Sequence, residues 1–587
     1  MISWFRWLPA RVMFFTSPFV AVPAVRVRTA ADSSAAAQGT MDALRSPALV
    51  AISRAEWRWV VIVTLCIVAA TYGPLALERT AGPADLVHVG TYVNGVDFSV
   101  YLAAMHEGAR SASWLIHDHF TAEPNHPVLM FPLYVAIGKL AAALGRDVLE
   151  VYGVVELAMR LMLGPVIYLF IAMLVPGTRG RRVAFALAAL GGSAAAWVVV
   201  LNTIPGLSIA LPGEPSVFSF FLAAPHLGLG LLVTLLTVVC FAAAYRGSRG
   251  AAWLLPLMLP VGWLINPYNL PALAVGIGAF GLVQILRERR ALGRPLVLCS
   301  LAVVPAMPLL LYNALTFNVD PFWRQVYSVQ NAMPSAPPWR LPLEYGVLLL
   351  LAPLSIWALR QQLTTPQRIA LAWLGAAALL MYLPVPYQRR FASAVWPALA
   401  AFAVLGWPTA EQLVTEGLRR VRLPSRLARP ALRTLVVATA FFTPLATLLV
   451  VTISTISATP AAVNTIDRDS YTLGQWIGEH SGEDDVVLAS YNTGNVLAGF
   501  LPGRVVAGHD AVTYDSVAKK AKLAALFGAQ LSSEEVRALL AANHVTYVVV
   551  GAGERAVGPY DPGLALGLPV VARVGSATAY SVPREGP

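Results

Sequence analysis

Three polar residues close together, Gln388, Arg389 and Arg390, could bind an anion. They follow a long apolar stretch, in the segment PYQRRFAS at 386–393. Guanidinium groups bind phosphate oxygens through paired hydrogen bonds, and the Gln388 amide offers one more donor. We therefore expect these residues to hold a lipid phosphate or diphosphate. The alternative is that two arginines at a helix end simply extend toward water.

A second group of polar residues precedes this one by almost three hundred positions and contains Asp97. The residues at 97–112 predict an amphipathic helix that lies on a membrane surface. Asp97 would open this helix, where the helix dipole favours an ionised carboxylate. An ionised carboxylate can act as a general base. An N-cap is the alternative role for Asp97, and the two roles are compatible.

The segment HDHFTAEPNH at 117–126 contains ligand types that suit a divalent metal. Asp118, His119 and His126 are the candidate metal ligands or acceptor contacts. Their spacing matches no tight zinc pattern, so metal binding is left open. Surface histidines whose charge changes with pH are the alternative.

The composition indicates which kind of protein must position these groups. The chain has 587 residues, of which 57% are hydrophobic and only 12% charged. So few charges cannot cover a soluble particle of this size, and apolar stretches long enough to cross a bilayer recur. We predict a polytopic α-helical membrane protein. The excess positive charge lies in short loops, which indicates a topology signal and no nucleic-acid partner.

Eleven transmembrane helices are expected, with basic loops on the cytoplasmic side. This topology requires the apolar segment at 127–144, which contains Lys139 and two prolines, to lie along the outer interface without crossing. The carboxyl terminus and the loop at 78–151 are then outside. The predicted spans are 57–77, 152–175, 183–203, 218–245, 251–265, 271–286, 295–312, 344–359, 368–384, 392–408 and 434–456.

Three regions follow from this topology. Residues 1–56 form a cytoplasmic extension, 57–456 the transmembrane domain, and 457–587 an extracytoplasmic α/β domain. The last region is mildly acidic, and its runs at 485–490, 545–550 and 569–574 are typical of strands. It has no nucleotide-binding motif. We expect it to cover or support the membrane domain, with acceptor binding as the alternative.

The order of these features resembles the GT-C superfamily of membrane glycosyltransferases that use polyprenyl-phosphate-linked sugars, close to the branch of aminoarabinose- and mannosyltransferases. Asp97 matches the catalytic aspartate of the family's first external loop. Glu123, followed by Pro124 and then PVLMFPLYVAIGKLAAALG, matches an acidic residue before the interfacial helix. Arg160 in VELAMRL matches the basic residue that opens the second span. The resemblance is best over 57–205.

The resemblance implies an inverting glycosyltransferase in a bacterial inner membrane. Asp97 would take a proton from the acceptor, with Glu123 as a second catalytic residue. Arg389, Arg390, Gln388 and Arg160 would bind the lipid phosphate. Many relatives have a lysine where this chain has Pro124, and no D-x-D follows Asp97, which leaves a divalent metal possible. The sugar and the acceptor, whether glycan, lipid or protein, are not predicted.

Two other classes of protein fit the same composition. A secondary transporter also places charged residues among apolar helices, and the segment LINPYNLP at 264–271 predicts a helix break of the kind that transporters use. The third possibility is a scaffold with this fold and no enzymatic activity.

Overall fold

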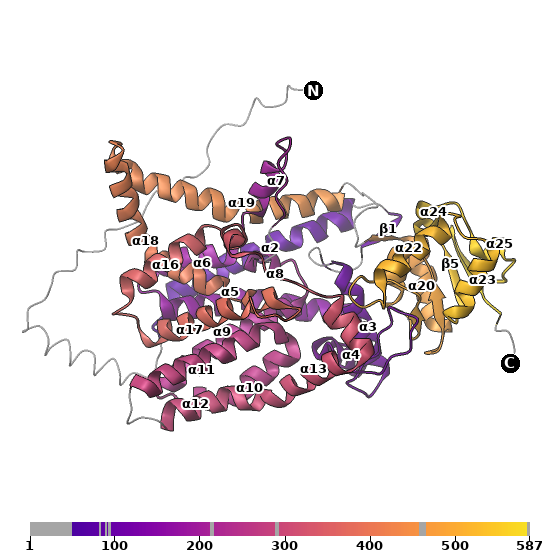
Figure 1. Cartoon of the computed structure of the whole chain (residues 1–587), viewed down its shortest axis with the longest axis horizontal. Helices are drawn as coiled ribbons and strands as arrows, with labels where there is room; N and C mark the ends of the chain where they lie inside the picture. Colours follow the sequence, from indigo (N-terminus) through magenta and orange to yellow (C-terminus); the bar gives the residue numbers. More distant parts are fainter. Residues whose placement is uncertain are drawn as a thin grey trace, which may run out of the picture.

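A bundle of long apolar helices is joined at one end to an α/β domain in the computed structural model of the chain (Figure 1). The structure describes residues 50–81, 84–88, 91, 95–211, 216–287, 293–456 and 465–583. Most of the predicted N-terminal extension at 1–56 therefore lies outside the described residues. The boundary of the C-terminal domain at 457 stays a prediction, since residues 457–464 are also outside them.

The helical bundle follows the hydropathy pattern closely. Every predicted span overlaps a helix. Within the described residues, six helices are long and apolar enough to cross a membrane, or eight if two bent pairs are each one span. The count of eleven therefore stays a prediction. The principal helices of the bundle are α2 (Arg54–Ala81), α5 (Val148–Leu174), α6 (Thr178–Leu190), α7 (Ala195–Leu201), α9 (Pro225–Tyr245), α10 (Arg249–Ile265), α11 (Leu270–Arg287), α12 (Gly293–Val303), α13 (Met307–Val319), α16 (Val347–Leu359), α17 (Thr365–Leu380), α18 (Trp396–Arg420) and α19 (Ala428–Ile456).

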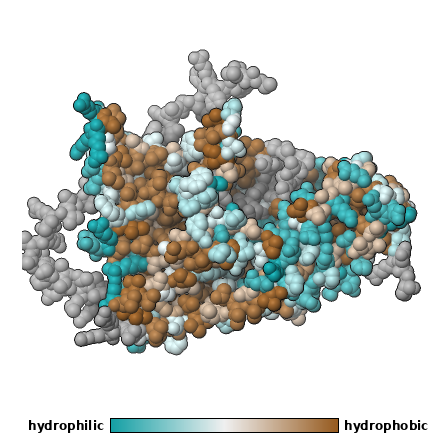
Figure 2. Space-filling model, viewed as in Figure 1, coloured by the Kyte–Doolittle hydropathy of each residue, from teal (hydrophilic) through white to brown (hydrophobic). Residues whose placement is uncertain are grey.

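The outer surface of the bundle is apolar. Large side chains face outward along it, among them Trp253, Leu379 and Leu445, which are 81%, 74% and 67% exposed. Figure 2 shows this apolar surface over the bundle and a mostly hydrophilic surface over the C-terminal domain. Exposed apolar area on this scale would be costly in water. The chain is a membrane protein, as its composition predicted.

Two helices of the predicted external loop lie between the bundle and the C-terminal domain, namely α3 (Phe98–Arg110) and α4 (Pro132–Leu144) (Figure 1). Their backbones nearly touch, since a Cβ atom on Gly138 would lie 1.9 Å from the Met105 carbonyl oxygen. At the same crossing the rings of Tyr101 and Tyr134 stack 4.4 Å apart. Only glycine permits so close an approach.

The helix α3 differs from its prediction. Every residue from Phe98 to Met105 is buried, so α3 has no polar face in contact with solvent along this stretch. One side packs on α4, and Val100 and Ala103 pack into a cluster formed mainly by the C-terminal domain. The prediction that this helix lies on a membrane surface is therefore wrong, because the C-terminal domain covers the side that was expected to be free.

The helix α4 is short and apolar, and its location along the outer interface stays a prediction. Its 13 residues span about 20 Å, which is shorter than a hydrocarbon core of about 30 Å. It begins at Pro132 and ends before Gly145, whose φ is +60°. Lys139 donates a hydrogen bond of 2.7 Å to the Ser111 carbonyl, so its charge is held at the end of α3.

The C-terminal domain is an α/β structure, as predicted. Its sheet has the order β4-β3-β5-β7-β6, with β3 parallel to β4 and β5, and β7 antiparallel to β5 and β6. The three predicted strands correspond to β3, β5 and β6, whereas β4 and β7 were not predicted. The strands are β3 (Val486–Leu488), β4 (Arg504–Val505), β5 (Tyr547–Val550), β6 (Val570–Val574) and β7 (Ala577–Ser581), and the helices are α20 (Arg468–His480), α21 (Tyr491–Leu497), α22 (Ser516–Phe527), α23 (Ser533–Ala542), α24 (Ala552–Val557) and α25 (Pro562–Ala565).

The junction between the two parts has its own hydrophobic core. Strand β1 (Leu86–His88), from the external loop, pairs antiparallel with β2 (Thr465–Asp467) at the start of the C-terminal domain. Ile466, Val496 and Phe500 of the C-terminal domain pack in one cluster with residues of α3 and α4. The C-terminal domain is therefore packed directly against the external loop.

The close crossing of α3 and α4 predicts the effect of adding one methyl group. Gly138→Ala should lower the melting temperature of the detergent-solubilised protein, because its Cβ would overlap the Met105 carbonyl; overpacking typically costs about 1–3 kcal/mol. Gly153→Ala in α5 is the matched control, since a Cβ there meets nothing within 4 Å. Equal melting temperatures for the two variants would contradict the proposed contact.

Candidate active site

A cavity of about 350 Å³ opens where the helical bundle meets the C-terminal domain. Residues from six separate segments line it, within 97–132, 226–227, 263–271, 309–333, 380–391 and 509–512. Most of the wall is apolar, with leucines of α13 and α17 and the end of α10. The polar residues in the wall are Asp97, Tyr101, His226, Asn266, Tyr268, Asn313, Asn318, Tyr327, Asn331, Tyr387, Arg390 and His509. A cavity of this composition suits a ligand with a polar head and an apolar tail.

Asp97 lies at the end of a 3-10 turn, Gly95–Asp97, directly before α3. It occupies the N-cap position of α3, but its side chain makes no capping hydrogen bond to the helix. Instead its Oδ1 atom lies 3.1 Å from the Nε2 atom of His509 in the C-terminal domain. The Asp97 side chain is 37% exposed, and this exposure is toward the cavity that it lines.

The proton on His509 can be assigned from its other ring nitrogen. The Ala511 backbone N–H donates to His509 Nδ1 over 3.1 Å, so in the neutral ring the proton must be on Nε2. His509 then donates to Asp97. Burial by itself would raise the pKa of Asp97, but the hydrogen bond from His509, together with the charge of Arg390, outweighs it and holds the pKa below its usual value. Asp97 is therefore ionised at neutral pH.

Arg390 reaches the same cavity from the short helix η7 (Gln388–Ala392). Its Nε atom contacts the Met333 sulfur at 3.0 Å, and its guanidinium carbon lies 5.9 Å from the centre of the Tyr268 ring. In the described part of the chain it forms no ion pair with Asp97 within 4.0 Å. The two charges thus face one cavity with space between them.

The two predicted neighbours of Arg390 have other positions. The Gln388 side-chain oxygen accepts the backbone N–H of Ser335 at 3.1 Å. Arg389 is not among the described residues that line the cavity, and its own backbone N–H bonds to the Met333 carbonyl. The structure thus brings Asp97 and Arg390 together at the cavity and leaves Gln388 and Arg389 behind its wall.

Aromatic side chains form the part of the wall nearest these charges. The hydroxyl groups of Tyr268 and Tyr327 lie 2.7 Å apart. His226, also in the wall, is contacted through Nδ1 at 2.7 Å by the hydroxyl of Tyr134, which is not among the described residues that line the cavity. Tyr268 follows the predicted helix break between α10 and α11, where the Asn266 side chain accepts its backbone N–H. Rings with polar tips of this kind can pack against a sugar and bond its hydroxyl groups.

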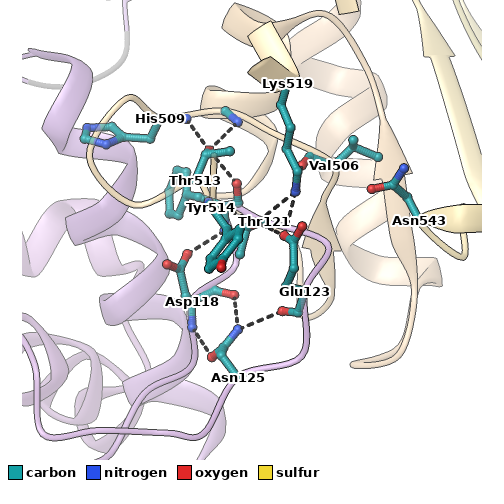
Figure 3. Close-up of polar contacts among 12 residues, drawn as sticks. Asp118, Thr121, Glu123, Asn125, Val506, His509, Thr513, Tyr514, Lys519 and Asn543 are labelled. Atoms are coloured by element: carbon teal, nitrogen blue, oxygen red, sulfur yellow. Dashed lines mark hydrogen bonds and ion pairs between the residues drawn. The ribbon is translucent and has the colours of Figure 1, made fainter. Parts of the chain in front are cut away.

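Glu123 lies outside the cavity, at the contact between the external loop and α22. Its carboxylate accepts a hydrogen bond of 2.6 Å from Lys519 and another from Thr121. Lys519 also donates to Thr121 Oγ1 and to the Val506 carbonyl, both at 3.1 Å. Figure 3 shows Lys519 reaching down from its helix toward these two residues of the loop. This placement does not support a catalytic role. Glu123 instead helps to hold α22 of the C-terminal domain against the external loop.

The three candidate metal or acceptor contacts do not converge. Asp118 is buried and accepts the Phe120 backbone N–H. His119 lies between Glu107 Oε2, at 3.1 Å, and the Gly503 carbonyl. The His126 carbonyl accepts from Trp323. Among the described residues, no three His, Cys, Asp or Glu side chains are arranged to hold a metal ion, and we propose no metal site.

Arg160 is buried within the bundle on α5 and does not line the cavity. Its Nη2 atom lies 2.8 Å from Glu156 Oε1, one turn earlier, and its guanidinium carbon lies 4.3 Å from the centre of the Tyr72 ring. Both side chains of the ion pair are almost inaccessible to solvent. The ion pair lies within α5, and the contact with the Tyr72 ring is made across to α2. This placement does not support contact with a donor phosphate.

Sequence reasoning missed His509 and His226. His226 follows Pro225 at the start of α9, and nothing in its local pattern distinguishes it from other residues at helix ends. His509 lies in the segment AGHDAVTYDS after β4, which carries no recognisable motif. Its partner is 412 residues earlier in the chain, so only the packing of the two parts could reveal the pair.

Comparisons with known proteins give structural likeness without close kinship. No protein-family model and no curated protein matches the chain. The solved oligosaccharyltransferase of Archaeoglobus fulgidus, tethered with an acceptor peptide, has 14% identity and a TM-score of 0.48 over 84% of this chain and 69% of its own. ArnT from Cupriavidus metallidurans, bound to undecaprenyl phosphate, has 14% identity and a TM-score of 0.45 over 90% and 99%.

A third solved structure is similar at the same level. It is AglB from Archaeoglobus fulgidus with an inhibitory peptide and a dolichol-phosphate, with 14% identity and a TM-score of 0.42 over 91% of this chain and 75% of its own. All three TM-scores are below 0.5.

Asp118 predicts a pH dependence of stability. Burial raises the pKa of its carboxyl to about 7, although the Phe120 N–H acts in the opposite direction. An acid whose pKa is raised on folding favours the native state at low pH, and this advantage is lost as the pH rises from about 4 to about 7. The melting temperature should therefore fall over this range in the wild type and change less in Asp118→Asn. Identical pH profiles would contradict the assignment.

Proposed function

We propose that this protein is an inverting glycosyltransferase that moves a sugar from a polyprenyl-phosphate donor to an acceptor outside the cytoplasm. The observation that carries the proposal is the pairing of an ionised carboxylate, Asp97, with the guanidinium of Arg390 across one largely apolar cavity. A lipid-linked sugar phosphate needs both an apolar channel and a cationic contact. The structural neighbours bound to dolichol-phosphate and undecaprenyl phosphate are consistent with this donor class.

The proposed reaction is a single displacement. Asp97 takes the proton of an acceptor hydroxyl or amine, and the oxygen or nitrogen then attacks the anomeric carbon of the sugar. A new bond forms there while the bond from that carbon to the phosphate oxygen breaks, which inverts the configuration. The lipid phosphate leaves with the electron pair of this bond. Because phosphate is already a good leaving group, the reaction needs no general acid to protonate it, whereas a glycosidase needs one.

Arg390 has the electrostatic role in this scheme. Negative charge increases on the departing phosphate, and a guanidinium already facing the cavity stabilises it without reorganisation. Among the described residues that line the cavity, Arg390 is the one with a permanent positive charge. Tyr268 and Tyr327 offer hydroxyl groups beside it. The location in an inner membrane, with this cavity on the extracytoplasmic side, belongs to the same proposal.

Secondary transport is the second candidate, because two helix pairs are bent in a way that transporters also show. The bends are 56° between α6 and α7 and 105° between the helical segment Pro338–Tyr345 and α16. Neither bend lies among the residues that line the cavity. Asp97 and Arg390 thus lie away from these two bends, whereas the break between α10 and α11 does line the cavity. The enzyme is preferred because of the pair of charges across the cavity, and the position of the helix breaks does not separate the two candidates.

Replacement of the base tests the reaction. Asp97→Asn keeps the shape of the side chain but cannot accept the proton, so transfer from a radiolabelled polyprenyl-phosphate sugar should fall by about 10²–10⁴-fold. Donor binding should change little. Transfer at the wild-type rate would refute the proposed base, and sugar uptake into proteoliposomes that is unaffected by this change would favour transport.

Substitution of two adjacent arginines tests the proposed contact with the donor phosphate. Arg390→Ala should lower kcat/KM by about 10²–10³-fold, the usual loss when one preorganised charge contact is removed. Arg390→Lys should recover part of this loss. Arg389→Ala is the matched variant, because Arg389 does not line the cavity, and it should stay near the wild-type value. Equal losses for the two alanine variants would show that the guanidinium at 390 has no special role.

A further inference from the structure

Besides the hydrophobic packing described above, the C-terminal domain makes polar contacts with the external loop at Asp97 and at the residue before it. Asn495, at the buried face of α21, donates a hydrogen bond of 3.2 Å to the Val96 carbonyl. His509, from the segment after β4, bonds the Asp97 carboxylate itself. Two adjacent residues of the loop are therefore held by one domain that lies about four hundred residues further along the chain.

The segment that carries His509 is fixed by a network of hydrogen bonds. Thr513 Oγ1 accepts the backbone N–H groups of Gly508 and His509 at 3.0 and 2.9 Å, and donates to the Phe120 carbonyl at 2.7 Å. The Ala511 N–H on Nδ1 sets the orientation of the ring. His509 is only 5% exposed. These bonds fix the position of the ring and determine which of its nitrogen atoms carries the proton.

The other side of this segment is fixed by the external loop. The Tyr514 backbone N–H donates to Thr121 Oγ1 at 3.2 Å, and Lys519 contacts the same oxygen and Glu123. Figure 3 shows Thr513, Tyr514 and Lys519 of the C-terminal domain facing Thr121 and Glu123 of the loop. Docking of the domain and placement of His509 therefore depend on the same few bonds.

We infer that His509 is a positioning residue for Asp97, so that the C-terminal domain completes the active site. The inference rests on the proposed function and extends it. The Nε2–H of His509 donates a hydrogen bond to Oδ1 of Asp97. Oδ2 is then the oxygen that accepts the proton of the nucleophile. The hydrogen bond also stabilises the ionised form of the carboxylate. His509 touches the base and acts through it.

If His509 positions Asp97, its removal should change how the transfer rate depends on pH. The groups whose charges or hydroxyls face Asp97 are His509, Arg390, His226, Tyr101, Tyr134 and Tyr268. His509 makes the only hydrogen bond to the Asp97 side chain in the described part of the chain. Its removal raises the pKa of Asp97, so the acidic limb of the rate profile should move to higher pH.

The test compares three variants of the full-length protein in detergent or nanodiscs. His509→Phe removes the donor, and kcat should fall about 10- to 100-fold, the value of a hydrogen bond to a charged group. His509→Gln keeps an N–H donor and should recover most of the rate. His480→Phe is the control on the same domain, since His480 lies on the exposed end of α20, and it should match the wild type in rate and profile.

The outcomes separate the inference from the proposed function. A wild-type rate and pH profile in His509→Phe, or a glutamine variant as slow as the phenylalanine variant with an unshifted profile, would overturn the positioning role. If the wild type itself transfers no sugar, the proposed function fails, and nitrogen NMR of the His509 ring then decides the contact. A proton on Nε2 whose resonance moves in Asp97→Asn supports the pair; an unchanged resonance overturns it.

Discussion

Asp97 is the one carboxylate among the described residues that line the cavity, and it is charged beside a wall that is largely apolar. An isolated charge in such surroundings would take up a proton, because burial disfavours the ionised form. Two groups prevent this: the Nε2–H of His509 and the positive charge of Arg390. The three residues come from the external loop, the C-terminal domain and the segment before α18, so the fold has to bring these three segments to one place.

The positions of these three segments depend on close packing at several glycines, where a larger side chain would not fit. The glycines of α3 and α4 let the two backbones meet, and the cluster around them includes Val496 and Phe500 of the C-terminal domain. Gly494 and Gly508 act similarly within the domain, since a Cβ on Gly508 would lie 2.7 Å from the Asn495 backbone nitrogen. A bulkier residue at any of these contacts would displace the segment that holds Asp97 or the one that holds His509.

The sequence predicts some of this arrangement and not the rest. Hydropathy alone predicts the helices of the bundle and the short α4, because lipid requires every backbone group to be bonded within a helix. Residue type and position were enough to select Asp97 and Arg390. They could not separate Arg390 from Arg389, since which of two neighbours faces a cavity depends on the turn of η7. The burial of α3 and the His509 contact both arise from a domain that packs from far along the chain.

The same rule about backbone hydrogen bonds explains why the polar site lies at one end of the bundle. Asp97, Tyr268, Tyr327 and Arg390 each lie in a short irregular element: two 3-10 turns, a π-helix at Arg324–Val329 and η7. Such elements leave backbone groups without helical partners, and in a membrane they are tolerated only where protein or water satisfies them. Here side chains do so, as when Asn266 accepts the Tyr268 N–H and the Ser393 hydroxyl donates to the Arg390 carbonyl. The charged residues of the cavity therefore lie where helices of this protein stop, and the C-terminal domain covers that end.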